Sequence, residues 1–236
     1  MKKAAVFLLL MGLLLTVGCS KKTTGPEENP PEIPQNLEEH IVSVPQTAPA
    51  EVQAYAGYVN VFGYQFGFYN NFFSAAASQD PQYQDGKWVW TYSPPQGGFT
   101  ITVKAQVLDN GDQKWEIYFD GTISSGDTVV TVNNWKAAEG TISADGTRGE
   151  WTIYDYNSTT EVAHYSWTTA DNGTVTATLE VDNFKYVVVN NPDGSGNVKV
   201  YENDTLIFEA TWNADGSGQW TNYENNTQGT WGPIPS

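Results

Sequence analysis

Residues 174–223 read TVTATLEVDNFKYVVVNNPDGSGNVKVYENDTLIFEATWNADGSGQWTNY, and this stretch gives the clearest indication of the fold. Alternating β-branched and aromatic residues fill five runs, Thr174–Val181, Phe184–Val189, Asn197–Tyr201, Leu206–Trp212 and Gln219–Tyr223. Asp193-Gly194 and Asp215-Gly216 separate neighbouring runs, and Asp-Gly supplies the positive φ that two-residue hairpin turns need. Such runs and turns predict consecutive antiparallel strands.

The same pattern extends back to residue 85. Further turn dipeptides occur at Asp85-Gly86, Asn110-Gly111, Asp120-Gly121, Asp145-Gly146 and Asn172-Gly173. Strand-like runs lie between them, at Lys87–Tyr92, Phe99–Leu108, Lys114–Phe119, Thr128–Val132, Trp151–Tyr156 and Val162–Trp167. We therefore expect residues 85–236 to be a mainly β domain, an antiparallel up-and-down meander of about 10–12 strands. Because an open sheet this rich in aromatic residues would expose its edges, we expect it to form a barrel or half-barrel.

The domain contains an internal repeat, in which residues 114–157 match residues 184–226. At an offset of 70, Ala144-Asp145-Gly146 matches Ala214-Asp215-Gly216, and Glu139 matches Glu209. After a one-residue gap, Gly149-Glu150-Trp151-Thr152 matches Gly218-Gln219-Trp220-Thr221, and Tyr154 then matches Tyr223. A repeat of this kind predicts a sheet extended by duplication of hairpins, with Trp151 and Trp220 in equivalent positions.

Residues 50–84 form an aromatic-rich segment ahead of the meander. Apolar residues recur three and four positions apart, at Val52, Tyr55, Val59, Phe62, Phe66, Tyr69 and Phe73, which is typical of one helix face. Thr47, Pro49 and Glu51 fit a helix start. Tyr64, Phe66 and Phe68 also alternate as in a strand, so both readings stay open. We favour a helix that packs on the sheet.

The first 18 residues have the pattern of a secretory signal peptide. Lys2 and Lys3 precede an uncharged apolar run that is too short to span a membrane and ends at Leu15-Thr16-Val17-Gly18-Cys19. This ending resembles the lipobox of bacterial lipoproteins, with a small residue before the cysteine. The resemblance implies cleavage before Cys19, lipidation of its thiol and acylation of the new amino terminus. Ser20 in place of Asp implies transport to the outer membrane.

Residues 19–49 are expected to be the lipidated cysteine and a tether. Residues 20–49 hold six prolines, five glutamates and two lysines without an apolar period, and such segments stay extended. Residues 50–236 hold seven basic and 22 acidic residues, a balance of −15. Anionic lipid should repel a domain of this charge, so the anchor must hold it at the membrane.

Composition and motifs exclude several classes of function. The acidity argues against nucleic-acid binding, and the single cysteine excludes an internal disulfide framework. We expect no catalytic residue, metal site or cofactor, because no nucleophile elbow, phosphate-binding loop or EF-hand spacing occurs. His164 is interpreted as a cross-strand polar residue. Glu139 and Glu209 are interpreted as copies of one outward-facing position rather than a catalytic pair.

The aromatic residues are the main positive signal for ligand binding. Trp88, Trp90 and Tyr92 share one strand face, and Trp115 belongs to another strand. Three roles are open for these residues: they fill the core, they line a ligand cavity, or they form an exposed platform. We therefore expect a membrane-anchored envelope lipoprotein that acts as a non-enzymatic binding or structural module. The alternatives are a carrier of an apolar ligand such as lipid in a barrel cavity, and a surface glycan-binding protein that uses Trp and Tyr platforms.

Overall fold

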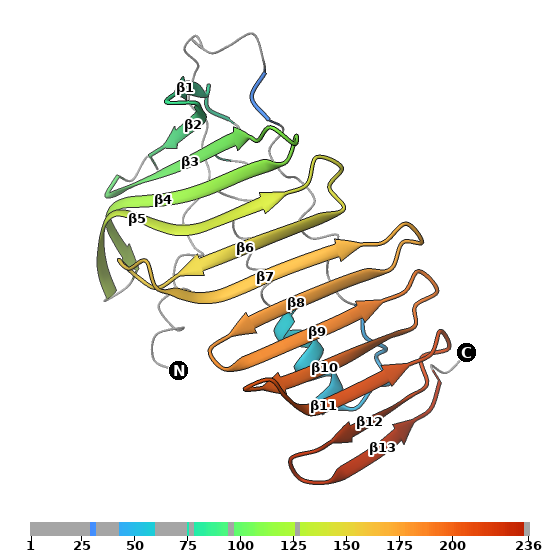
Figure 1. Cartoon of the computed structure of the whole chain (residues 1–236). Coiled ribbons are helices and arrows are strands. Elements are labelled where there is room, and N and C mark those ends of the chain that lie inside the picture. The colour runs from blue at the N-terminus through green and yellow to red at the C-terminus, as the bar shows by residue number, and fades with distance from the viewer. Residues whose placement is uncertain are drawn as a thin grey trace. The chain divides into compact units, whose positions relative to one another are not determined.

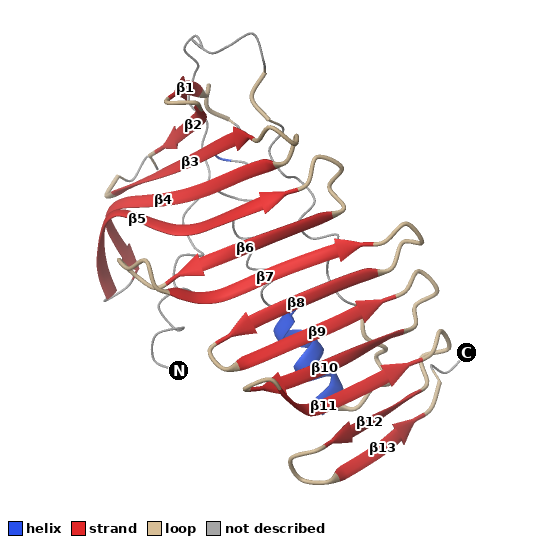
Figure 2. Cartoon of the chain, viewed as in Figure 1, coloured by secondary structure: helices blue, strands red, loops and turns tan. Residues whose placement is uncertain are grey.

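The computed structural model describes residues 29–31, 43–59, 75, 78–93, 97–125 and 128–233. The predicted signal peptide, Cys19 and most of the predicted tether lie outside these residues. The described residues form one short helix, over residues 50–59, and 13 strands that Figures 1 and 2 show as successive antiparallel ribbons. The strands are β1 (Gln82–Gln84), β2 (Lys87–Tyr92), β3 (Phe99–Val107), β4 (Gln113–Ser125), β5 (Thr128–Ile142), β6 (Arg148–Tyr154), β7 (Glu161–Thr169), β8 (Val175–Val181), β9 (Phe184–Asn190), β10 (Gly196–Glu202), β11 (Thr205–Trp212), β12 (Gly218–Asn222) and β13 (Thr227–Trp231).

The strands are hydrogen-bonded in sequence order from β1 to β13, which confirms the predicted antiparallel meander. Of the two expected forms, barrel and half-barrel, the closed barrel is wrong, because the strand order begins at β1 and ends at β13 without joining them. Alternation and turn dipeptides fix each strand's pairing with its neighbours. They carry no information on whether the first and last strands meet.

The described chain separates into two compact units. The first holds β1–β4, residues 128–141 of β5 and residues 153–161. The second holds the helix, residues 142–152 and residues 162–233. In each unit, one sheet face is buried and the other is more exposed and mostly polar, as alternation along half-buried strands predicts. We call these the core face and the outer face.

The helix over residues 50–59 confirms the start of the predicted helix. Val52 and Val59 are buried, and the Tyr55 ring lies 4.5 Å from the Phe208 ring on the core face of β11. The expected helical positions from Phe62 onward lie outside the described residues. The folded part also begins earlier than residue 50, since the Thr47 hydroxyl donates a 3.2 Å hydrogen bond to the Gly216 carbonyl. Thr47, which lies within the predicted tether of residues 19–49, is thus in contact with the second unit.

The turn dipeptides lie at hairpin ends, with one exception, but most loops contain three residues rather than two. In the β9–β10 loop, Asn191 N–H donates to the Ser195 carbonyl and Gly194 N–H donates to the Asn191 carbonyl. This is a type I turn followed by a glycine of positive φ, here +87°. The exception is Asp120-Gly121, which lies inside β4, so this predicted turn is wrong. Gly121 has φ of +113° because the Gly98 backbone approaches it closely.

The two copies of the repeat make equivalent contacts in their second half. The Tyr154 hydroxyl donates to the Glu139 carboxylate, and the Tyr223 hydroxyl donates to Glu209 over 2.5 Å. Trp151 is fully buried, and the half-buried Trp220 ring stacks on Phe208 of the core face. In the first half the predicted equivalence is wrong, because residues 128–142 form the single strand β5, whereas residues 198–212 span β10, a turn and β11.

Candidate functional site

The outer face of the first unit carries a concentration of positive charge. Four of the seven basic residues after residue 50 lie on neighbouring strands of this unit. Because core residues alternate with outer ones along a strand, a lysine next to a buried aromatic or aliphatic residue points away from the core. We call this group the lysine cluster, and its members are Lys87 on β2, Lys104 on β3, Lys114 on β4 and Lys136 on β5.

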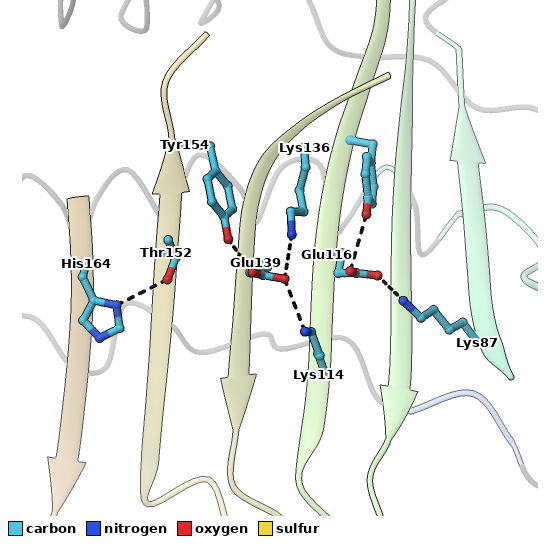
Figure 3. A network of polar contacts seen from close by, with 9 residues as sticks. Lys87, Lys114, Glu116, Lys136, Glu139, Thr152, Tyr154 and His164 are labelled. Carbon is cyan, nitrogen blue, oxygen red and sulfur yellow. Dashed lines mark hydrogen bonds and ion pairs between the residues drawn. The ribbon is translucent and has the colours of Figure 1, made fainter. Parts of the chain in front are cut away.

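Glu116 on β4 is the first of two carboxylates within the lysine cluster (Figure 3). It accepts a 2.5 Å ion-paired hydrogen bond from the Lys87 ammonium group, and the Tyr118 hydroxyl lies 3.4 Å from its other oxygen. Lys104 stands over the Tyr118 ring, 4.4 Å from the centroid, in cation–π geometry. Burial, followed by the nearby Glu116 carboxylate, raises the pKa of Tyr118 to about 12.

Glu139 on β5 is the second carboxylate and has three donors. It accepts from the Tyr154 hydroxyl on β6, and it pairs with Lys136 at 3.0 Å and Lys114 at 3.3 Å. Lys136 also lies 4.8 Å above the Tyr154 ring. Partial burial alone would raise the pKa of Glu139, but these donors outweigh it and lower the pKa to about 2.

This geometry suits binding better than acid–base catalysis. A general acid at neutral pH needs a raised pKa, whereas Glu139 is held ionised by its donors. Three of the four lysines pair with the two carboxylates, and Lys104 lies over the Tyr118 ring, so the cluster holds two more positive than negative side chains on an otherwise acidic chain. The Lys87, Lys114 and Lys136 side chains are each partly exposed. An anion can therefore reach them.

The second copy of the repeat holds part of this arrangement. The Glu–Tyr hydrogen bond occurs in both copies. Lys199 on β10 lies directly opposite Glu209, just as Lys114 on β4 pairs with Glu139. At the repeat offset of 70, Leu206 stands where Lys136 does, so Lys136 has no lysine counterpart in the second copy.

The carboxylate Glu139 makes stability depend on pH. Its pKa is about 2 in the folded chain against 4.5 for the free group, so its contribution is complete above pH 4.5 and is lost as pH falls toward about 2. We expect Glu139→Gln to flatten the fall of the urea midpoint over this interval, because the variant has no proton to take up there. Tyr154→Phe removes one of the three donors and should flatten it in part. Parallel curves for wild type and Glu139→Gln would contradict this account.

His164 is confirmed as a cross-strand polar residue. Its Nδ1 lies 3.4 Å from the Thr152 hydroxyl, as Figure 3 shows, and its Nε2 lies 4.0 Å from Glu150. Among the described residues, no group of three or more His, Cys, Asp and Glu side chains is placed to hold a metal ion. No helix in the described parts of the chain is both long and apolar enough to cross a membrane.

The four aromatic candidates from the sequence lie in the core of the first unit. Trp88, Trp90 and Tyr92 are almost fully buried, and Trp115 is completely so. The Trp90 and Trp115 rings are stacked, with centroids 5.9 Å apart. They therefore form no exposed platform. Sequence reasoning missed the lysine cluster, whose members are 10 to 22 residues apart and meet only once strand register is known.

Comparison with known proteins gives this chain no family. No family model matches the sequence, and a search of curated proteins finds no significant match.

Proposed function

We propose that this protein is a lipid-anchored, non-enzymatic binding module of the cell envelope, and that the lysine cluster is its ligand site. The proposed site rests on one observation: four of the seven basic residues after residue 50 lie on one face of an otherwise acidic domain. Like charges on neighbouring strands repel one another, and Glu116 and Glu139 offset only part of this repulsion, so a bound anion would stabilise the cluster further.

The spacing of the cluster favours an anionic polymer, and we propose an acidic glycan. Neighbouring strands are about 4.8 Å apart, so ammonium groups on four consecutive strands form a row rather than a single point. A chain of uronate or sulfated sugars presents negative charges in a row. The polar outer face around the cluster has hydroxyl groups for the sugar, including Thr100 and Thr102 on β3. This proposal keeps the glycan-binding alternative but moves it from the buried tryptophans to the lysines.

Binding can be tested by affinity electrophoresis in gels that contain polygalacturonate or neutral dextran. We expect Lys104→Gln with Lys114→Gln to weaken retardation by polygalacturonate about fivefold, since two exposed ion pairs contribute on the order of 1 kcal/mol together. The matched control is Lys185→Gln with Lys199→Gln, which changes the net charge equally but lies outside the cluster. Equal losses in both double variants would exclude the cluster as the site.

The anchor is a separate proposal that rests on Cys19 at the end of the apolar run. We expect Cys19→Ser to move the protein from the detergent-extracted outer-membrane fraction to the soluble fraction or to leave the precursor uncleaved. Several acyl chains give stable membrane attachment, so the shift should be nearly complete. An unchanged mass and unchanged partitioning would rule out lipidation. Because this test does not involve the glycan, either proposal can fail alone.

A carrier of an apolar ligand is the second candidate, favoured by the helix that covers the core face in the second unit. Val52 and Ala56 are fully buried there, and Tyr58 lies 5.5 Å from the Tyr186 ring. A carrier would retain its cargo during purification. Native mass spectrometry of the Cys19→Ser protein should then show a bound lipid, and a mass equal to the bare chain would set this candidate aside.

A further inference from the structure

The last strand, β13, leaves one edge of the sheet without a neighbour among the described strands. Its sequence, Thr227-Gln228-Gly229-Thr230-Trp231, has no charge and no proline, and Gln228 and Thr230 are exposed. Natural sheets protect their edges with short strands, charges or proline because an open edge can pair with another chain. β13 contains neither a charged residue nor a proline.

The opposite edge strand, β1, is protected. β1 has only three residues, Pro81 precedes it, and acidic residues flank it at Asp80 and Asp85. Among the described residues, one edge of the sheet is therefore protected and the other has no neighbouring strand.

The identity of a partner follows from a motif that β13 shares with β12. Each strand contains Gly-x-Trp, as Gly218-Gln219-Trp220 in β12 and as Gly229-Thr230-Trp231 in β13. The two strands pair so that each glycine faces the other strand's tryptophan, with Gln219 opposite Thr230 at the centre. The Gly-x-Trp motif is thus complementary to a second antiparallel copy of itself.

The same alternation crosses the core face of four strands. Gly196 pairs with Trp212, Trp212 pairs with Gly218, and Gly218 pairs with Trp231, which gives a row of glycine, tryptophan, glycine and tryptophan from β10 to β13. The glycines are required, because a Cβ at Gly196 would meet the Trp212 ring within 2.6–2.8 Å. A second row runs through Ala210, Trp220 and Gly229. The first row ends on a tryptophan at the open edge, and the second ends on a glycine.

We propose that β13 pairs antiparallel with β13 of a second copy of this chain, with the two Thr230 residues opposite each other. This register places Gly229 of the second copy next to Trp231, and Trp231 of the second copy next to Gly229. Both rows then continue with the correct alternation. The interface is two-fold symmetric, as most homodimer interfaces are.

Charge permits this contact despite the net charge of −16 on each copy. The paired strands themselves are uncharged. The nearest acidic residue on the hairpin, Glu224, lies six residues before Thr230, so the two copies place it at opposite ends of the interface. That separation exceeds the screening length of about 8 Å at physiological salt. In this register the two strands overlap over residues 229–231 only, and Pro233 follows two residues later, so the interface is small and we expect a weak dimer that covalent trapping reveals best.

The test is disulfide trapping in a Cys19→Ser background, in which the introduced cysteine is the single thiol. Residues directly opposite in an antiparallel pair have Cα atoms about 4.5–5.5 Å apart, which a disulfide can bridge. We expect Thr230→Cys to form covalent dimer under mild oxidation at least about tenfold more than Gln228→Cys, whose Cα would lie roughly 14 Å from its counterpart. Thr211→Cys, exposed on the interior strand β11, controls for random collision.

Sedimentation velocity supplies an independent measurement. Thr230→Lys places two positive charges opposite each other in the dimer and should remove any concentration-dependent increase in sedimentation coefficient, whereas Thr211→Lys should preserve it. The proposal is overturned if Thr230→Cys forms no more dimer than Gln228→Cys and Thr211→Cys. It is equally overturned if Thr230→Lys and Thr211→Lys sediment alike.

Discussion

Trp115→Ala is expected to destabilise the protein by about 3–5 kcal/mol, the usual cost of deleting a fully buried large aromatic side chain. Trp115 has no exposed surface, and its ring stacks on Trp90 across two strands. Removal therefore opens a cavity that neighbouring strands cannot close without losing their pairing. Urea unfolding followed by far-UV circular dichroism measures the loss without depending on tryptophan fluorescence.

The control for this prediction is Val129→Ala on β5. Val129 is 65% exposed, so its truncation should change stability by no more than about 0.5 kcal/mol. A small effect of Trp115→Ala, close to that of Val129→Ala, would mean that the tryptophan is dispensable for folding. The aromatic residues of β2 and β4 would then be free to serve a ligand, contrary to their burial.

The sequence predicted the strands and their faces because those depend on local pattern. Trp88, Trp90 and Tyr92 alternate with Val89 and Thr91, and only one of these sets can be buried. The helix start was predictable for the same reason, since the spacing of Val52, Tyr55 and Val59 is a local property. Closure of the sheet was not predictable, because it depends on whether strands from distant parts of the sequence pair with each other.

Turn chemistry was predictable in position but not in type. Asp-Gly fits both a two-residue turn and the end of a three-residue loop, because both need a positive φ at glycine. Asp85-Gly86 adopts the first form, with Gln84 directly opposite Lys87, and Asp193-Gly194 adopts the second. At Asp120-Gly121 the positive φ serves a close backbone approach within a strand. Nothing in the dipeptide itself distinguishes these uses.

The lysine cluster was hidden for a related reason. A lysine on an outer strand face is common when each strand is taken alone. The cluster exists because β2 to β5 are consecutive and in register, so that Lys104 faces Glu116 directly across β3 and β4. The repeat gives little help, since it matches Glu139 with Glu209, and strand register places Lys199 opposite Glu209 as Lys114 lies beside Glu139.

The second large effect is expected at Gly146 and Gly149. These two glycines are only three residues apart, but a different physical constraint excludes a larger side chain at each position. Gly146 has a φ of +71°, and no atom lies within 4 Å of the position that a Cβ would take, so its constraint is the backbone conformation alone. Gly149 has no positive φ, but a Cβ there would collide with the Trp167 ring. We expect Gly146→Val to cost about 1–3 kcal/mol as backbone strain and Gly149→Val to cost about 3 kcal/mol or more as overpacking.

Two further substitutions separate the two causes. Asn tolerates positive φ, so Gly146→Asn should recover much of the stability lost in Gly146→Val, whereas Gly149→Asn should be as damaging as Gly149→Val. Conversely, Trp167→Leu should reduce the cost of Gly149→Ala and leave the cost of Gly146→Ala unchanged. A double-mutant cycle in urea gives this coupling, which we expect to exceed about 1 kcal/mol for Gly149 and to be near zero for Gly146. If both glycines coupled equally to Trp167, ring contact would not explain the glycine at 149, and the Gly–Trp rows would lose their physical basis as the packing rule of this sheet.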